Sequence, residues 1–151
     1  NGSGCGCLWR SDSLVMNALR IILGLFLGLF VGAMVNGSFI ELGMKIFPYP
    51  NGVNFDTTEG MKAFNGLPFK YYIFPFIAHA MGTLSGCLIA LLLVRTYAIW
   101  VVYTIGSLFL VGGIMAVYMI NAPLWFDILD LSVAYFPMAW LSTKSKFAKT
   151  A

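Results

Sequence analysis

Charged side chains are scarce in this chain of 151 residues. Asp, Glu, Lys and Arg make up 10% of it, against about 25% in an ordinary soluble domain. Hydrophobic residues make up 60%, and the mean hydropathy is +0.85. So few polar side chains cannot cover a water-facing surface, and we expect lipid to solvate most of the chain. The net charge of +3 is small and scattered, which excludes nucleic acid as a partner.

Cysteine is also rare, and three cysteines cannot form a framework of paired disulfides. Cys5 and Cys7 lie in the Gly- and Ser-rich stretch GSGCGC, and Cys87 lies in an apolar run. We interpret the first two as part of a flexible head, with a lipidation or metal site as the alternative. Residues 1–15 are thus expected to be a head that is non-native or an upstream extension, and residues 16–151 a single membrane domain.

Recognisable catalytic motifs are missing. The chain contains no nucleophile elbow of the G-x-S-x-G type, no Gly-rich phosphate loop and no HExxH. We therefore expect a protein that is not an enzyme. With a single histidine, His79, the chain cannot supply two-histidine haem ligation. A tetrapyrrole held by His79 and one of Met81, Met115 or Met119 remains the weaker alternative to no cofactor at all.

Long apolar runs are what the chain does have. A helix needs about 20 apolar residues to cross a bilayer. Four runs of roughly this kind are found, at residues 19–47, 69–94, 97–120 and 124–141. They predict an all-α fold, a transmembrane four-helix bundle.

The junctions between the runs predict how they connect. Only Arg95 and Thr96 separate the second run from the third, which predicts a tight antiparallel hairpin. Pro123 can open the fourth helix at its first turn, and Pro137 should kink it.

Basic residues predict the orientation. One side of the bundle would carry Arg10, Arg20, Arg95, Lys144, Lys146 and Lys149, and the other Lys45, Lys62 and Lys70. This asymmetry favours a multi-pass protein with both termini in the cytoplasm or its equivalent.

The one long loop covers residues 48–68. Asp56 and Glu59 have the spacing of a capping box, which predicts a short helix over residues 57–64. Met61 and Phe64 would lay this helix on the membrane surface or over the mouth of the bundle. We interpret the loop as a surface loop with one or two helical turns, and keep a functional lid as the alternative.

Small residues recur every fourth position on the first two helices. The first helix carries Gly24, Gly28 and Gly32, and the second carries Ala78, Gly82, Gly86 and Ala90. Helices in lipid associate where small residues let backbones approach. The pattern predicts close packing between these faces, and it fits an internal contact or a dimer contact equally well.

A few polar residues lie inside the apolar runs. His79 borders the small-residue face of its helix, and we expect it to point into the bundle and to bond to Asn36 at similar depth. Asp127 and Asp130 share one face of the fourth helix. Glu41 has Lys45 four residues on. Intramembrane ionisable groups are costly and are functional candidates by default, so the candidate polar site is His79, Asp130, Asn36, Asp127 and Glu41.

Each candidate also has a structural interpretation. Glu41 and Lys45 can form an interfacial salt bridge, and Asp127 can be a helix N-terminal acid that favours the helix dipole. Asp130 is either a structural hydrogen-bonding group or a functional carboxylate. His79 either forms an interhelical hydrogen bond or handles a proton, ion or ligand.

Two stretches of the chain resemble a family. FPFIAHAMGT, residues 74–83, and the elements Trp125-Phe126 and Asp130-Leu131 resemble small uncharacterised bacterial four-span integral membrane proteins. The resemblance covers about residues 19–141. It implies the four-span fold and brings no activity, cofactor or site residue.

The sequence thus favours a non-enzymatic integral membrane protein that serves as an accessory or structural subunit. Its expected partners are the lipid bilayer and either further copies of itself or a larger membrane complex. The main alternative is a small transporter or channel for protons or a small solute. Its site would be the candidate polar site named above, in the outer half of the bundle. A pigment- or haem-binding subunit is the weaker one.

Overall fold

Helices make up almost all of the structure, a computed structural model that describes residues 5–50, 53 and 57–145, with side chains from residue 14 onward. No strand occurs in this part of the chain. The elements are α1 (Cys5–Ile46), α2 (Thr58–Ala63), η1 (Phe64–Gly66), α3 (Lys70–Leu93), α4 (Ala98–Met119), α5 (Leu124–Val133) and α6 (Phe136–Thr143). Four helical segments are long and apolar enough to cross a membrane. The predicted all-α bundle of a multi-pass membrane protein is confirmed.

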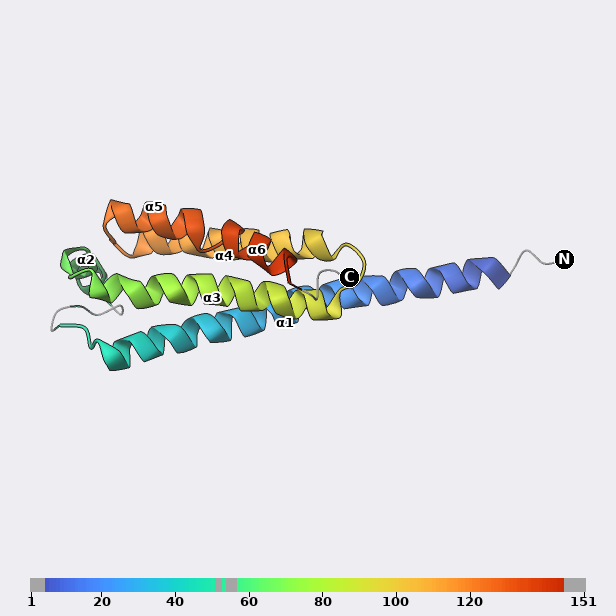
Figure 1. The fold of residues 1–151 in the computed structure, drawn as a ribbon, viewed down its shortest axis with the longest axis horizontal. Coiled ribbons are helices and arrows are strands. Elements are labelled where there is room, and N and C mark those ends of the chain that lie inside the picture. Colours follow the sequence, from blue (N-terminus) through green and yellow to red (C-terminus); the bar gives the residue numbers. More distant parts are fainter. Residues whose placement is uncertain (1–4, 51–52, 54–56, 146–151) are drawn as a thin grey trace.

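The helices form an elongated bundle in which α3 lies between α1 and the remaining helices (Figure 1). The start of α1 and the end of α6 lie away from the end that carries α2 (Figure 1). The predicted runs at residues 69–94 and 97–120 match α3 and α4 to within one residue at each end.

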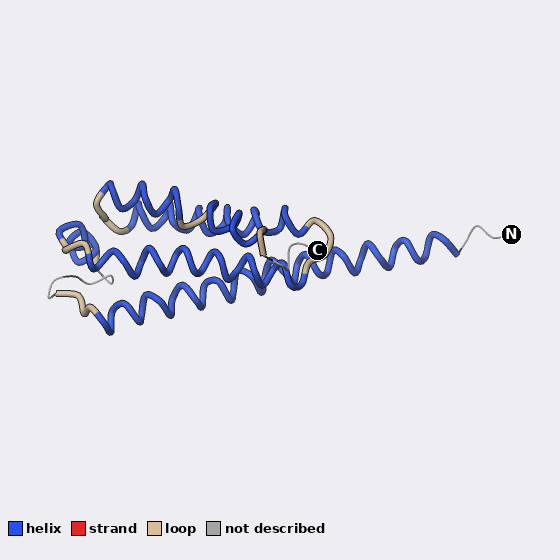
Figure 2. The backbone as a smooth tube through the Cα atoms, in the orientation of Figure 1, coloured by secondary structure: helices blue, strands red, loops and turns tan. Residues whose placement is uncertain are grey.

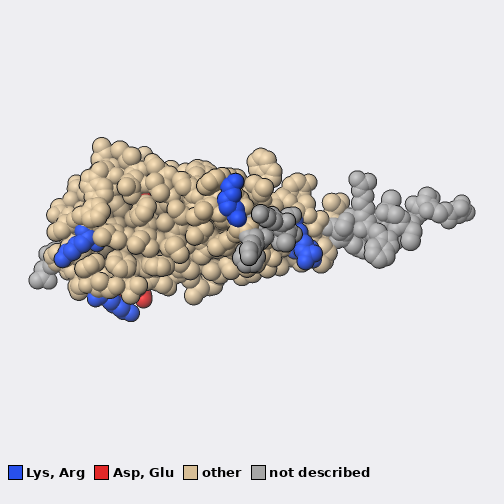
Figure 3. Space-filling model, in the orientation of Figure 1, with Lys and Arg blue, Asp and Glu red and all other residues tan. Residues whose placement is uncertain are grey.

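Basic side chains form two separate groups along the bundle. On the face drawn in Figure 3, a band without Lys or Arg separates two groups of basic side chains. At the α2 end, the Lys70 ammonium lies 5.2 Å from the Tyr71 ring centre, and at the other end that of Lys144 lies 4.9 Å from the Trp140 ring centre. Such aromatic and basic pairs are typical of the membrane–water interface.

α1 is longer than a single membrane crossing requires. Its 42 residues span about 63 Å at the α-helical rise. It begins at Cys5, so residues 5–15 are helical in the structure, whereas we expected a flexible head. No Gly or Pro occurs between Leu8 and Leu23 to end the helix there. As a result, α1 continues well beyond the bundle (Figures 1 and 2).

The α3–α4 connection is the tight hairpin that the sequence predicts. α3 ends at Leu93 and α4 begins at Ala98. Tyr97 adopts a left-handed conformation with φ of 62°, which reverses the chain. Its carbonyl oxygen then accepts a hydrogen bond from the Val101 N–H at 3.1 Å, which starts α4.

The fourth span is broken, and not simply kinked as we expected. α5 ends at Val133 and α6 begins at Phe136, with Pro137 in its first turn. Proline has no N–H to donate to the Val133 carbonyl, and its ring clashes with that carbonyl in a continuous helix. The break therefore falls at residues 134 and 135, three and two residues before the proline.

α1 and α3 approach each other closely along their glycines. A methyl group added at Gly28 would lie 2.7 Å from the Gly86 carbonyl oxygen, and one at Gly86 would lie 2.6 Å from the Gly28 carbonyl oxygen. Gly32 and Gly82 have the same reciprocal relation, at 2.6 and 2.9 Å. A side chain at any of these four positions would separate the two backbones.

Toward the end of this contact, the α1 glycines face residues larger than glycine. Gly24 faces Val94 at one end, and a methyl group at Gly28 would also lie 3.5 Å from the Ala90 Cβ. Ala78 and Ala90 are buried. The small-residue face of each helix is therefore turned toward its neighbour within one chain.

Gly28→Ala is expected to lower the stability of the bundle by about 1–3 kcal/mol, the usual cost of overpacking a tight contact. Gly37→Ala is the matched control, because it lies on the same helix and a methyl group there meets nothing within 4 Å. Its stability should stay constant or rise by up to about 1 kcal/mol. Thermal unfolding in detergent would measure both, and equal stabilities for the two variants would contradict the assigned contact.

Candidate functional site

A cavity of about 230 Å³ lies in the half of the bundle nearest α2. Its walls come from α3, α4 and α5, with contributions from α1 and the loop after it. Most of the lining is apolar. The polar side chains that line it are those of Tyr49, His79, Asp127 and Asp130.

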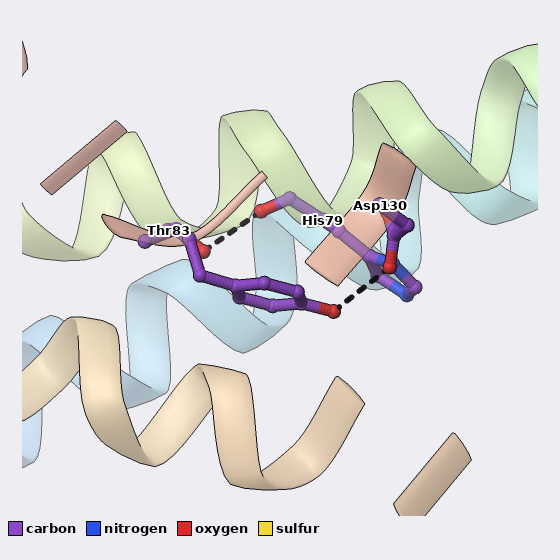
Figure 4. Close-up of polar contacts among 4 residues, drawn as sticks. His79, Thr83 and Asp130 are labelled. Atoms are coloured by element: carbon purple, nitrogen blue, oxygen red, sulfur yellow. Dashed lines mark hydrogen bonds and ion pairs between the residues drawn. The ribbon is translucent and has the colours of Figure 1, made fainter. Parts of the chain in front are cut away.

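At the cavity wall, α3 and α5 are joined by a pair of titratable side chains. His79 Nδ1 lies 2.8 Å from Asp130 Oδ2, and the two side chains are 18% and 5% exposed. This is the one ion-pair contact among the described residues. The Tyr135 hydroxyl donates to the same Oδ2 at 3.1 Å. Figure 4 shows the His79 ring and the Asp130 carboxylate side by side.

The hydrogen bond constrains where the proton lies. A carboxylate oxygen has two lone pairs, so Oδ2 can accept one hydrogen from the Tyr135 hydroxyl and a second from His79 Nδ1. The His79 ring also stacks on the Tyr135 ring, with centres 5.9 Å apart. Thr83 donates its hydroxyl to the His79 backbone carbonyl at 2.9 Å, so this hydrogen bond does not involve the imidazole (Figure 4).

The helix break is what brings Tyr135 to Asp130. Five residues apart on a regular helix, the two side chains would point about 140° away from each other. Tyr135, with φ of −115° and ψ of −80°, leaves the helical conformation and turns its ring back into the bundle. Gly113 on α4 makes room for it, because a methyl group there would collide with the Tyr135 hydroxyl. The sequence analysis missed both residues.

One oxygen of the buried carboxylate has no partner. Asp130 is 3% exposed, and its Oδ1 has no hydrogen-bond partner among the described residues. Buried polar atoms are nearly always hydrogen-bonded, and an exception in a native structure needs a reason. Because Asp130 also lines the cavity, a bound molecule is one such reason.

Asp127 lies one turn closer to α2 than Asp130. It is half-buried in the first turn of α5 and lines the same cavity. Its position is also where an acid favours the helix dipole. The two carboxyl groups thus face one space, as their spacing of three residues predicts.

A cap segment, α2 and η1 at residues 58–66, lies over the α2 end of the bundle. Thr57 caps α2 by accepting the Gly60 N–H at 3.1 Å. Asp56, to which we assigned this cap, lies outside the described residues. Phe64 is buried, lines the cavity and packs edge-on against Tyr72, with ring centres 4.9 Å apart.

Tyr72 fixes the cap segment to α3. Its hydroxyl donates to the carbonyl oxygens of Phe64, at 2.6 Å, and Asn65, at 3.1 Å. Tyr49, in the preceding loop, also lines the cavity, and burial raises the pKa of its phenol above the ordinary value. The short helix therefore covers the end of the bundle, which is one of the two placements that the sequence predicts, and the loop contains the one or two helical turns that we expected.

The remaining predicted site residues are placed elsewhere. Asn36 is half-buried against Gly82 and forms no hydrogen bond with His79. Since His79 follows Ala78 by one residue, it projects about 100° from the face that meets α1. Glu41 is exposed, does not line the cavity and forms no ion pair with Lys45. The site thus contains His79, Asp127 and Asp130 of the five candidates.

Cofactor ligands can also be placed. Met81, Met115 and Met119 are exposed on the outside of the bundle, and none of them lines the cavity with His79. In the described part of the chain, no three His, Cys, Asp or Glu side chains are grouped to hold a metal ion. The side chains of Cys5 and Cys7 lie outside the description. Comparisons with models of protein families, with curated proteins and with solved structures found no match.

Tyr135→Phe is expected to lower stability by about 0.6–2 kcal/mol, the range for one interhelical hydrogen bond in a membrane. The change removes one of the two donors to Asp130 Oδ2 and preserves the ring. Tyr118→Phe is the matched control, because Tyr118 is 87% exposed on α4. If both variants unfold at the same temperature as the wild type in detergent, the hydrogen bond to Asp130 does not contribute as described.

Proposed function

We propose that the protein is a small multi-pass membrane carrier that binds a solute in the cavity beside Asp130. The observation that carries the proposal is the buried carboxylate itself. Asp130 is 3% exposed in an apolar bundle, lines a cavity of about 230 Å³ and has one oxygen without a partner. Ionisable groups at such depth are costly and typically mark a pathway for an ion or substrate.

A purely structural role accounts less well for this arrangement. A carboxylate that only holds helices together is expected to have both oxygens satisfied and its surroundings filled, since a partly satisfied buried network is unfavourable. Here the network ends at Oδ2. Asp130 also lines the cavity.

The shape of the bundle favours a carrier over an open channel. The half remote from α2 is closed by fully buried side chains, among them Cys87, Val102 and Ile105. A solute that enters from the α2 end therefore meets a packed wall beyond Asp130. Transport would require a rearrangement that opens this wall. α6, which the break at residues 134–135 separates from α5, is the segment best suited to move.

We further propose that the α2 end faces outward. Arg20, Arg95 and Lys144 lie at the opposite end, and the excess of basic residues on one side favours its placement in the cytoplasm. The cavity would then be loaded from outside, and both termini would lie inside.

An accessory subunit remains the second candidate, and one observation favours it. α1 extends past the bundle with exposed apolar side chains, including Leu14, Val15 and Ile22, each at least 63% exposed. Lipid can cover this surface, and so can the helix of a partner. In that case gentle purification from native membranes would recover a partner in fixed stoichiometry.

Proteoliposomes provide the test. We expect the wild type to take up at least one of three labelled probes, a small amine, a small polyol and a small carboxylate, faster than protein-free liposomes do. Asp130→Asn should abolish this uptake, because the amide removes the charge from the cavity wall. Glu41→Gln is the matched control, since Glu41 is an exposed carboxylate that does not line the cavity.

The variants must first be shown to fold. Asp130→Asn and Glu41→Gln should both elute as monodisperse protein in detergent. Uptake equal to that of protein-free liposomes for all three probes would overturn the carrier. So would equal uptake by wild type and Asp130→Asn.

A further inference from the structure

We infer that the cavity binds a small organic cation, an amine with a short apolar body, whose ammonium group donates to Asp130 Oδ1. The inference rests on the proposed solute site and specifies its ligand. It follows from three features of the cavity: the charge of its lining, its aromatic walls and the hydrogen-bonding state of Asp130.

The charge of the lining favours a cation. Among the residues that the structure describes, two carboxyl groups, Asp127 and Asp130, and one imidazole, His79, line the cavity, and no Lys or Arg does. The lining that the structure describes thus holds more acidic than basic side chains. An anion in the cavity would be repelled by the two carboxyl groups and could pair only with the His79 imidazole. In surroundings of low dielectric, this difference is large.

The apolar walls fit the body of such a ligand. The rings of Tyr49, Phe64 and Phe126 line the cavity at the end nearest the cap segment, and Val117 and Ile120 line it from α4. Aromatic faces attract ammonium groups, and more strongly when water is excluded. A volume of about 230 Å³ equals roughly eight water molecules at about 30 Å³ each. Since a cavity of about 150 Å³ can hold benzene, this cavity has room for a single ring with a short side chain.

Asp130 is prepared to accept one more hydrogen. His79 and Tyr135 both contact Oδ2, at 2.8 and 3.1 Å, and so fix the carboxylate from one side. Oδ1 is buried without a partner. Oδ1 is buried in this structure, so we infer that the carboxylate rotates when the ligand binds and that Oδ1 then accepts a hydrogen from the ligand N–H. His79 and Tyr135 are positioning residues in this arrangement, and Asp130 is the group that touches the ligand.

Three probes of the same shape separate charge from size. Benzylamine is a cation at neutral pH, benzyl alcohol is neutral and benzoate is an anion. Binding to the purified full chain in detergent would be measured by the shift in unfolding temperature, because a ligand that binds the folded state stabilises it. We expect benzylamine to stabilise the wild type in a concentration-dependent manner and the other two to have little effect.

Variants then locate the cation. Asp130→Asn should weaken benzylamine binding about tenfold or more, since it replaces a charge-assisted hydrogen bond by a neutral one. Asp127→Asn should weaken it less, and it serves as the second test if Asp130→Asn fails to fold. Val117→Phe should abolish binding by filling the cavity. Glu41→Gln should bind benzylamine as the wild type does.

The outcomes separate the ligand class from the carrier. Stabilisation by benzoate or benzyl alcohol equal to that by benzylamine would overturn the cation and leave a solute site in place. No stabilisation by benzylamine, or stabilisation unchanged in both Asp127→Asn and Asp130→Asn, would also overturn it. Benzylamine binding that depends on Asp130, combined with no uptake of any probe in proteoliposomes, would support the cation and overturn the carrier.

Discussion

A carboxyl group buried among apolar helices must be given hydrogen-bond donors, and the arrangement around Asp130 follows from this constraint. Its two donors come from α3 and from the residue that separates α5 from α6. Neither is available without a specific feature of the fold. His79 reaches Asp130 because it lies off the face that α3 presents to α1. Tyr135 reaches it because the fourth span is broken before Pro137 and because Gly113 leaves room for the hydroxyl.

The packing of the other helices leaves this polar cluster beside a cavity. α1 and α3 approach through reciprocal glycine contacts, so the two backbones are closely packed along this stretch. The half remote from α2 is filled by buried side chains of α3, α4 and α6. The cavity lies toward α2, where Phe64 of the cap segment lines it. Asp130 thus lies between a packed half of the bundle and the cavity, which is the arrangement on which the proposed solute site rests.

Much of the fold could be predicted from the sequence, because lipid imposes a simple rule on length and hydropathy. The runs at residues 69–94 and 97–120 became α3 and α4 almost unchanged, and Asp127 and Asp130 share a cavity as their spacing predicts. What could not be predicted depends on rotation about helix axes and on contacts distant in sequence. For example, the sequence predicted that His79 bonds to Asn36, whereas in the structure it bonds to Asp130, 51 residues away. Pro137 predicted a kink in the fourth span, but neither the full break nor the contact of Tyr135 with Asp130 could be predicted.

The histidine–carboxylate pair can be observed directly, because His79 is the only histidine in the chain. In a preparation labelled with ¹⁵N-histidine and reconstituted in lipid, every imidazole signal in the NMR spectrum reports this one ring. We expect Nδ1 to carry a hydrogen in the wild type, and its shift to change clearly in Asp130→Asn, where an amide replaces the acceptor. Identical imidazole spectra for the two proteins would contradict the pair and, with it, the assignment of Asp130 to the cavity.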